Sequence, residues 1–308
     1  MAGSIFDDLP QQGEPDLSGF QWLDLRHAVE QAPEPLDFVL PGFKSGTVGA
    51  LVSPGATGKT MLALQAAVTV SGGPDMLDFA SMDTAWRRTA GRVVFLTGED
   101  PADVLNGRFH AIGQRLNPAE REAMFENLSV APLVGRGADV MTFEWRRWIA
   151  GVTRDARLVV IDTLRRFHQL DENDGGHMAG LLAYMEQLCR ENSTTVLFLH
   201  HTSKAGALNG GDAQQASRGS SVLTDNARFQ ANLVGMTPEQ AKQFDVDENC
   251  RRNFVRLSFP KINYSAPIPD QWFRRRDGGL LEPAVLERGT FKIAKTGSFQ
   301  KGGDDERW

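Results

Sequence analysis

One stretch constrains the fold of this chain more than any other: residues 49–63, which read GALVSPGATGKTMLA. An apolar run enters the stretch, a glycine-containing turn follows, and a helix-forming run leaves it. In this context a Gly-Lys-Thr sequence indicates phosphate binding, because free backbone amides and the positive end of a helix dipole face the same anion. The alternative is a chance Gly-Lys-Thr in a surface loop, and the flanking strand and helix patterns argue against it.

The residues expected to contact a nucleotide are consecutive. They are Ser53, Pro54, Gly55, Ala56, Thr57, Gly58, Lys59, Thr60 and Met61. Lys59 can reach the β and γ phosphates of ATP, and the Thr60 hydroxyl can hold Mg²⁺, so both cofactors are expected. The loop departs from the full pattern at Ser53, where glycine is usual. Serine is small and tolerates turns, so the departure does not exclude phosphate binding.

Length and composition limit the classes of protein to consider. The 308 residues suit one large domain or two small ones. The acidic N-terminus lacks a signal peptide, and the chain has no apolar run of membrane-spanning length. The two cysteines, Cys189 and Cys250, form neither a disulfide framework nor a zinc site, which suits a reducing, cytoplasmic setting. We therefore expect a cytoplasmic protein and, without a membrane-spanning run, no membrane partner. A net charge of −6 argues against a uniformly basic nucleic-acid binder but leaves room for a basic channel.

Strands and helices alternate after the phosphate-binding stretch. Apolar strands are expected at 47–52, 91–100, 157–163 and 194–201, with helices at 59–71, 102–114 and 118–127 between them. This order predicts an α/β fold with a mostly parallel central sheet flanked by helices. Further on, residues 253–259 and 261–266 alternate in polarity, and we expect them to pair as two strands. The predicted organisation is a mobile tail at 1–25, one ATPase domain at 26–290 and a disordered tail at 291–308.

Two acids end apolar strands, where the ligands of a parallel sheet bind. Glu99 is the candidate general base for an attacking water, and a solvated loop acid is its alternative. Asp162 is the candidate acid that orients Mg²⁺, and a helix N-cap is its alternative. Asp100 is a second candidate base, although a helix cap before Pro101 is the better interpretation.

Later residues supply the remaining candidates. His200 and His201 end another strand, and alternation of side chains allows one of them to sense the γ-phosphate, whereas a pair of core or loop histidines is the alternative. Arg218 and Arg228 are candidates for an arginine finger, and each has the alternative of a surface arginine. The loop at 202–216, with Lys204, is expected to grip DNA phosphates. The segment at 272–276, WFRRR, could contact nucleic acid or form a solvated turn.

Several separate blocks resemble one known family. They include GTVGALVSPGATGKTMLALQAA, GGPDML, the acids at 99–100, VIDTLRRFH, VLFLHHTSK, QQASRGSSVLTDNAR, RRNFVR and WFRRRDGGLLEPAVLER. These blocks span roughly residues 35–290. They are similar to the RepA-type hexameric replicative helicases of IncQ plasmids, which are related to the RecA-like motor domain of DnaB helicases.

The resemblance implies a RecA-like fold, a homohexameric ring, ATP sites between subunits and single-stranded DNA threaded through the ring. By position it makes Glu99 the catalytic base, His201 rather than His200 the phosphate sensor, and Arg228 the finger. Lys204 and Arg218 are then expected to contact DNA. The resemblance suggests 5′→3′ unwinding, and it leaves open how the protein meets a plasmid primase or an origin-binding initiator.

Three functions are compatible with the sequence. The first is an ATP-driven helicase for plasmid replication. The second is a RecA-like DNA-dependent ATPase, such as a recombinase or a regulatory switch, that does not unwind duplexes. The third is a nucleotide-binding assembly protein without hydrolysis, against which Glu99 and Asp162 argue.

Overall fold

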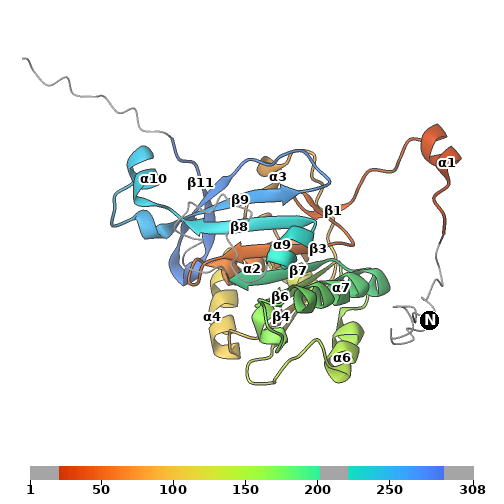
Figure 1. Cartoon of the computed structure of the whole chain (residues 1–308). Coiled ribbons are helices and arrows are strands. Elements are labelled where there is room, and N and C mark those ends of the chain that lie inside the picture. The colour runs from red at the N-terminus through yellow and green to blue at the C-terminus, as the bar shows by residue number, and fades with distance from the viewer. Residues whose placement is uncertain (1–20, 202–220, 288–308) are drawn as a thin grey trace, which may run out of the picture. The chain divides into compact units, whose positions relative to one another are not determined.

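The computed structural model describes residues 21–201 and 221–287 (Figure 1). Most of the two expected tails, Lys204 and its loop, and Arg218 lie outside the described residues. The chain divides into two compact units, residues 1–36 and 37–308. The first unit contains α1 (Leu25–Glu30), which the Asp24 side chain caps and in which no residue is buried. The domain limits expected from the sequence stay a prediction.

A large sheet forms the framework of the second unit. Within the described residues it has nine strands in the order β11-β10-β9-β8-β3-β7-β6-β4-β5. The parallel strands are β3 (Val48–Ser53), β4 (Val93–Thr97), β5 (Leu128–Pro132), β6 (Leu158–Asp162), β7 (Val196–His201) and β8 (Phe229–Gly235). The antiparallel strands are β9 (Phe254–Ile262), β10 (Gln271–Arg275) and β11 (Leu281–Ala284). A separate hairpin pairs β1 (Phe38–Leu40) with β2 (Phe43–Lys44).

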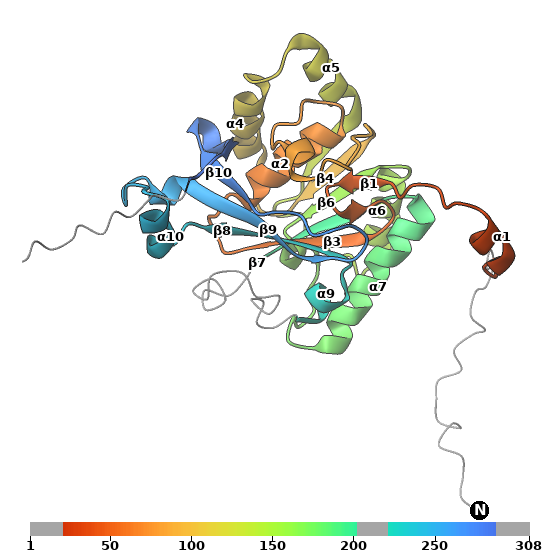
Figure 2. The same cartoon turned by 90° about the horizontal axis from the view of Figure 1, so that it is seen from above.

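Helices cover both faces of this sheet. They are α2 (Lys59–Val70), α3 (Phe79–Met82), α4 (Ala102–Gly113), α5 (Pro118–Asn127), α6 (Phe143–Thr153), α7 (Gly175–Asn192), α9 (Ser221–Asn226) and α10 (Pro238–Gln243), with 3₁₀ turns at Leu164–Phe167, Arg251–Asn253 and Asp277–Gly279. Figure 2 shows α2, α4 and α5 on one side of the sheet and α7 and α9 on the other. None of the described helices is long and apolar enough to cross a membrane.

Strand alternation divides the apolar residues between two cores. In β4, Val93 and Phe95 pack in the core that contains α2, whereas Val94 and Leu96 pack in the core that contains α7. Because both faces of the parallel strands are buried, these strands read as continuous apolar runs. The predicted α/β class with a mostly parallel, helix-flanked sheet is confirmed.

The expected pairing of 253–259 with 261–266 is wrong. Most of the first segment and the first two residues of the second belong to one strand, β9, which pairs with β8 on one side and β10 on the other. Pro260 separates the two expected segments, and proline lacks the N–H that a sheet ladder needs. The register shifts between Gln230 and Asn232 of β8, where Phe259 and Pro260 face a single residue. A β-bulge of this kind accommodates proline inside a strand.

Candidate active site

The phosphate-binding stretch forms the turn between β3 and α2. Ala56 has a φ of 60° and Gly58 a φ of 101°, so the chain turns through left-handed backbone before Lys59 begins α2. Glycine tolerates this conformation without steric cost, which explains Gly58. The Thr57 hydroxyl donates to the Pro54 carbonyl at 2.9 Å and closes the turn. Ser53 is buried at the end of β3, where a small side chain fits.

The sheet order brings two more predicted residues to this turn. Strands β3, β7, β6 and β4 are neighbours and parallel, so their carboxyl ends meet at one edge. The Lys59 Nζ atom lies 3.2 Å from each ring nitrogen of His201. The His201 Nε2 atom lies 3.2 Å from Glu99 Oε1. The structure therefore places Lys59, His201 and Glu99 in one continuous polar chain.

The surroundings of Glu99 favour its charged form. The hydrogen bond with His201 is the largest of several effects that lower the pKa of Glu99 to about 2. The Thr163 hydroxyl adds a second hydrogen bond, donating to Glu99 Oε1 at 2.9 Å. Burial lowers the pKa of Lys59 to about 8, against the opposing charges of Asp162 and Glu99. Glu99 in this arrangement is an ionised and well-partnered carboxylate.

Asp162 fits the role of a metal-orienting acid. It is fully buried at the end of β6, and burial raises its pKa to about 6 against the opposing effects of Lys59 and Thr60. Its Oδ1 atom has no hydrogen-bond partner in the described structure, so it could accept a cation or a cation-bound water. The described residues contain no group of three or more His, Cys, Asp or Glu that could hold a metal alone. Thr60 and Asp162 would thus hold Mg²⁺ together with nucleotide phosphates, as this ion commonly requires.

The expectation that Asp100 caps a helix is wrong. The N-cap of α4 is Pro101, and the Asp100 carboxylate instead pairs with Arg108 at 2.9 Å. Asp162 is not a helix cap either, because Thr163 occupies the N-cap position of the following 3₁₀ turn. Of the two acids after β4, the geometry favours Glu99, since it contacts both His201 and Thr163.

The chain places Arg228 far from this site. Its backbone N–H donates to the Val48 carbonyl at the start of β3, whereas the phosphate-binding turn follows Ser53 at the end of that strand. Five residues of strand separate the two positions, which corresponds to roughly 17 Å. Arg228 is exposed, and its guanidinium makes no hydrogen bond or ion pair with any described residue. An arginine at this end of the sheet cannot serve the nucleotide of its own subunit.

Comparison with known proteins identifies the family. The sequence model described as "AAA domain" matches residues 14–207, well over half of the chain. The chain belongs to the AAA-domain family. It is an NTPase domain of that family and is expected to bind a nucleotide at the site described above.

Solved structures agree with this assignment of the fold. A structure described as an ATPase domain matches with a TM-score of 0.51 at 15% identity, over 84% of this chain and 96% of that chain. A DnaB-like replicative helicase, described with its interactions with primase, matches with a TM-score of 0.56 at 16% identity, over 88% of this chain and 68% of that chain. At these identities the similarity is one of fold.

Sequence reasoning missed one residue at the nucleotide site of this AAA domain. Arg275, on β10, donates to the carbonyl oxygens of Thr57 at 2.7 Å and Ala56 at 3.4 Å. It was one of three consecutive arginines interpreted as a nucleic-acid contact or a solvated turn. No local signal distinguishes it from its neighbours, because the contact spans 218 positions of sequence.

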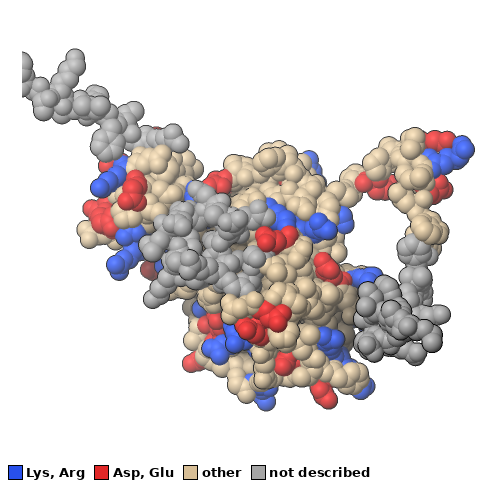
Figure 3. Space-filling model, in the orientation of Figure 1, with Lys and Arg blue, Asp and Glu red and all other residues tan. Residues whose placement is uncertain are grey.

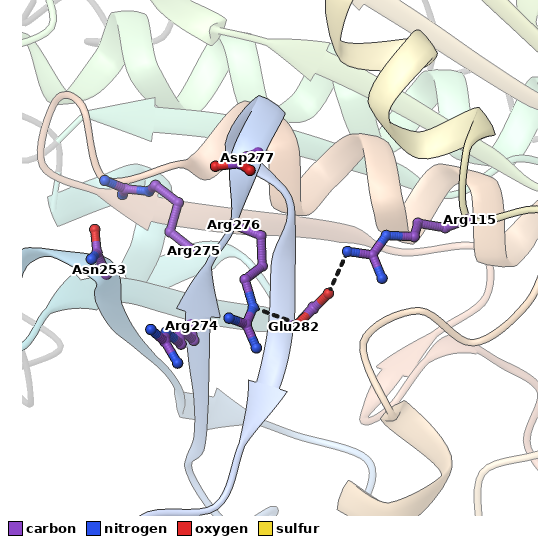
Figure 4. Close-up of a pocket in the computed structure, with 7 residues that line it drawn as sticks. All are labelled: Arg115, Asn253, Arg274, Arg275, Arg276, Asp277 and Glu282. Atoms are coloured by element: carbon purple, nitrogen blue, oxygen red, sulfur yellow. Dashed lines mark hydrogen bonds and ion pairs between the residues drawn. The ribbon is translucent and has the colours of Figure 1, made fainter. Parts of the chain in front are cut away.

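The hairpin that carries Arg275 is fixed against the helix of the phosphate-binding turn. The buried Gln65 side chain exchanges two hydrogen bonds of 2.9 Å with the backbone of Leu281 and so ties α2 to β11. Figure 4 shows the pocket beside this hairpin, with a volume of about 650 Å³. The Glu282 carboxylate forms ion pairs with Arg115 at 2.8 Å and with Arg276 at 2.6 Å. Arg275 is directed to the turn, where it donates to the Thr57 carbonyl. Arg275 therefore supports the shape of the phosphate-binding turn from within the same subunit.

We expect Arg275→Ala to weaken ATP binding by about 10-fold, because a charged donor to two loop carbonyls is lost. Titration of a fluorescent ATP analogue measures this change. Arg274→Ala is the matched control, since its guanidinium lies 5.9 Å from the centre of the Phe254 ring instead of on the loop. Equal affinities for the two variants would contradict the supporting role of Arg275.

His200 gives a prediction about stability. Burial lowers its pKa to about 4, and the nearby Lys59 charge adds to the effect. Between pH 6.5 and 4 the unfolded chain therefore binds a proton that the folded chain does not, so stability falls as the pH falls. This group alone should lower the free energy of unfolding by on the order of 2 kcal/mol between pH 7 and pH 5. Urea denaturation at both pH values should show a smaller loss for His200→Gln, and an unchanged loss would contradict the assignment.

Proposed function

We propose that this AAA domain is an ATP-driven DNA helicase that acts in plasmid replication as a ring of six subunits. The observation that carries the proposal is the contact of His201 with both Lys59 and Glu99. His201 ends β7 and directly precedes residues 202–220, in which the DNA contacts are expected. A side chain in this position can report the state of the γ-phosphate to the segment that follows it.

The proposed roles follow from the contacts. Lys59 holds the β and γ phosphates, and Thr60 and Asp162 hold Mg²⁺, which when bound neutralises charge on the phosphates. Glu99 takes a proton from the attacking water. A carboxylate with a pKa of about 2 is a weak base, so we propose that the His201 contact is a resting arrangement. When His201 turns to the γ-phosphate, Glu99 loses its main partner and becomes a stronger base.

The proposed DNA contacts do not require a basic surface. On the face in Figure 3, Lys and Arg are interspersed with Asp and Glu, in agreement with the net charge of −6. We propose that Lys204 and Arg218, which lie outside the described residues, grip DNA phosphates without reading sequence. The similarity in fold to a DnaB-like replicative helicase supports this assignment, and interactions with primase are described for that protein. A primase and an origin-binding initiator are accordingly proposed partners.

The test is strand displacement on a forked DNA duplex with ATP and Mg²⁺. Unwinding by the purified chain, with a mass in solution of six subunits, would support the proposal. Lys59→Ala is the control, because it removes the charge that holds the phosphates and should abolish both hydrolysis and unwinding. ATP hydrolysis that single-stranded DNA stimulates without strand displacement would instead identify a RecA-like DNA-dependent ATPase.

A further inference from the structure

Lys261 lies beside the segment that carries Arg228. It belongs to β9 and pairs with Gln230 of β8. Its Nζ atom donates to the backbone carbonyls of Thr224, at 3.3 Å, and Asp225. These two residues belong to the last turn of α9, which ends at Asn226. The last carbonyls of a helix have no partner within the helix, and a cation there satisfies them.

The backbone on both sides of Arg228 is fixed by these contacts. Before it, Lys261 holds the end of α9, and the Ala227 N–H donates to the Leu223 carbonyl at 3.1 Å. After it, Phe229 enters the sheet opposite Gly49 of β3. The Arg228 side chain, by contrast, is exposed and makes no hydrogen bond or ion pair within the described residues. An anchored backbone with a free guanidinium suits a side chain that acts on another molecule.

The charge of Lys261 adds a second effect. The positive charges of Lys261 and Arg228 are close enough to repel each other. The negative charge of Asp225 attracts the Lys261 ammonium group. Repulsion from the Lys261 ammonium group disfavours side-chain conformations in which the Arg228 guanidinium packs against its own subunit. Lys261 therefore fixes the backbone before Arg228, and its charge disfavours a guanidinium position beside it.

We propose that Lys261 is a positioning residue that holds α9 and directs Arg228 toward the nucleotide of a neighbouring copy of this chain. The proposal rests on the proposed function, in which Arg228 is a finger supplied to the adjacent subunit. It assigns Lys261 no contact with the nucleotide. The expected defect of a Lys261 variant is thus a loss of catalysis that depends on Arg228.

The test uses the full chain with Lys261→Met, which keeps the apolar stem and removes the charge. Loss of its hydrogen bonds should lower kcat for ATP by about 10- to 100-fold, while KM and the mass of the ring stay unchanged. Lys261→Arg, which still donates to carbonyls, should stay near the parent rate. Lys242→Met, at an exposed position on α10, is the control for loss of a lysine charge away from Arg228 and should also keep the parent rate.

Two further measurements separate positioning from other roles. In an Arg228→Ala background, Lys261→Met should cause no additional loss, because the residue on which it acts is gone. Mixed rings of Lys261→Met and Glu99→Gln subunits should regain activity. At some interfaces the correctly positioned Arg228 of a Glu99→Gln subunit meets the intact Glu99 of a Lys261→Met subunit. Additive losses would show that Lys261 acts independently of Arg228 and would overturn the inference.

The outcomes also distinguish this inference from the proposed function. If Arg228→Ala hydrolyses ATP normally, the finger assignment fails and the inference fails with it. If Arg228→Ala is impaired while folded Lys261→Met is not, only the inference is overturned. If Lys261→Met does not fold, Lys261→Gln replaces it, since its amide retains a shorter donor. The Gln variant should then show an intermediate kcat, and a parent rate would count against the positioning role.

Discussion

Replacing Glu99 with glutamine should leave ATP binding intact and slow hydrolysis by on the order of 10²- to 10⁴-fold. The amide keeps the size of the side chain and can still contact Thr163, which now donates to Glu99 Oε1 at 2.9 Å. It cannot accept a proton from water at neutral pH. Nucleotide affinity and single-turnover hydrolysis, measured on the same preparation, separate binding from chemistry.

The neighbouring acid supplies the control for this prediction. Asp100→Asn removes a carboxylate one position away that pairs with Arg108 and contacts neither His201 nor Thr163. It should hydrolyse ATP far faster than Glu99→Gln. A Glu99→Gln variant that fails to bind nucleotide would indicate a structural role for Glu99. Equal defects in the two variants would show that the base has been assigned to the wrong acid or to neither.

Replacing Arg228 with alanine should lower hydrolysis by about 10³- to 10⁵-fold, the range expected for an arginine finger. The reason lies in its position. Arg228 follows α9 at the start of β8, beside Val48, while Lys59 of the same chain lies beyond the opposite end of β3. The variant should still fold, still form rings and still bind ATP through its own Lys59. Steady-state hydrolysis, nucleotide affinity and mass in solution check these expectations.

Mixed rings test whether Arg228 acts on a neighbour. When Arg228→Ala and Glu99→Gln subunits are combined, some interfaces join an intact Glu99 site to an intact Arg228. Hydrolysis should therefore rise above that of either variant alone, with a maximum at an intermediate mixing ratio. A surface arginine without a catalytic role predicts no initial loss. Proven mixing without any recovery would defeat the assignment to a neighbouring subunit.

Local patterns were sufficient for most of the fold. The centres of the expected strands 91–100 and 194–201, residues 93–96 and 196–199, are apolar because helices cover both faces of a parallel sheet, and the sequence alone indicates that burial. The predicted helix 118–127 agrees with the structure to the residue, and the structure shows a capping box of Asn117 and Glu120 at its start. Prediction failed at Pro260, where a bulge that depends on the partner strand β8 lets the strand continue. Whether a proline ends a strand depends on the pairing of that strand with its neighbour in the sheet and not on the residues next to the proline in the chain.

The candidate site divides in the same way. The sequence by itself determined the turn between strand and helix and the positions of Glu99 and Asp162 near strand ends, because a turn and a strand end are local features with local residue preferences. Only the tertiary structure decided that His201 contacts Lys59 and Glu99 while His200 is buried, that Arg275 supports the turn, and that Arg228 lies at the far end of β3. These relations depend on strand order and register, which hydrogen bonds between distant segments set, and no short stretch of sequence specifies them.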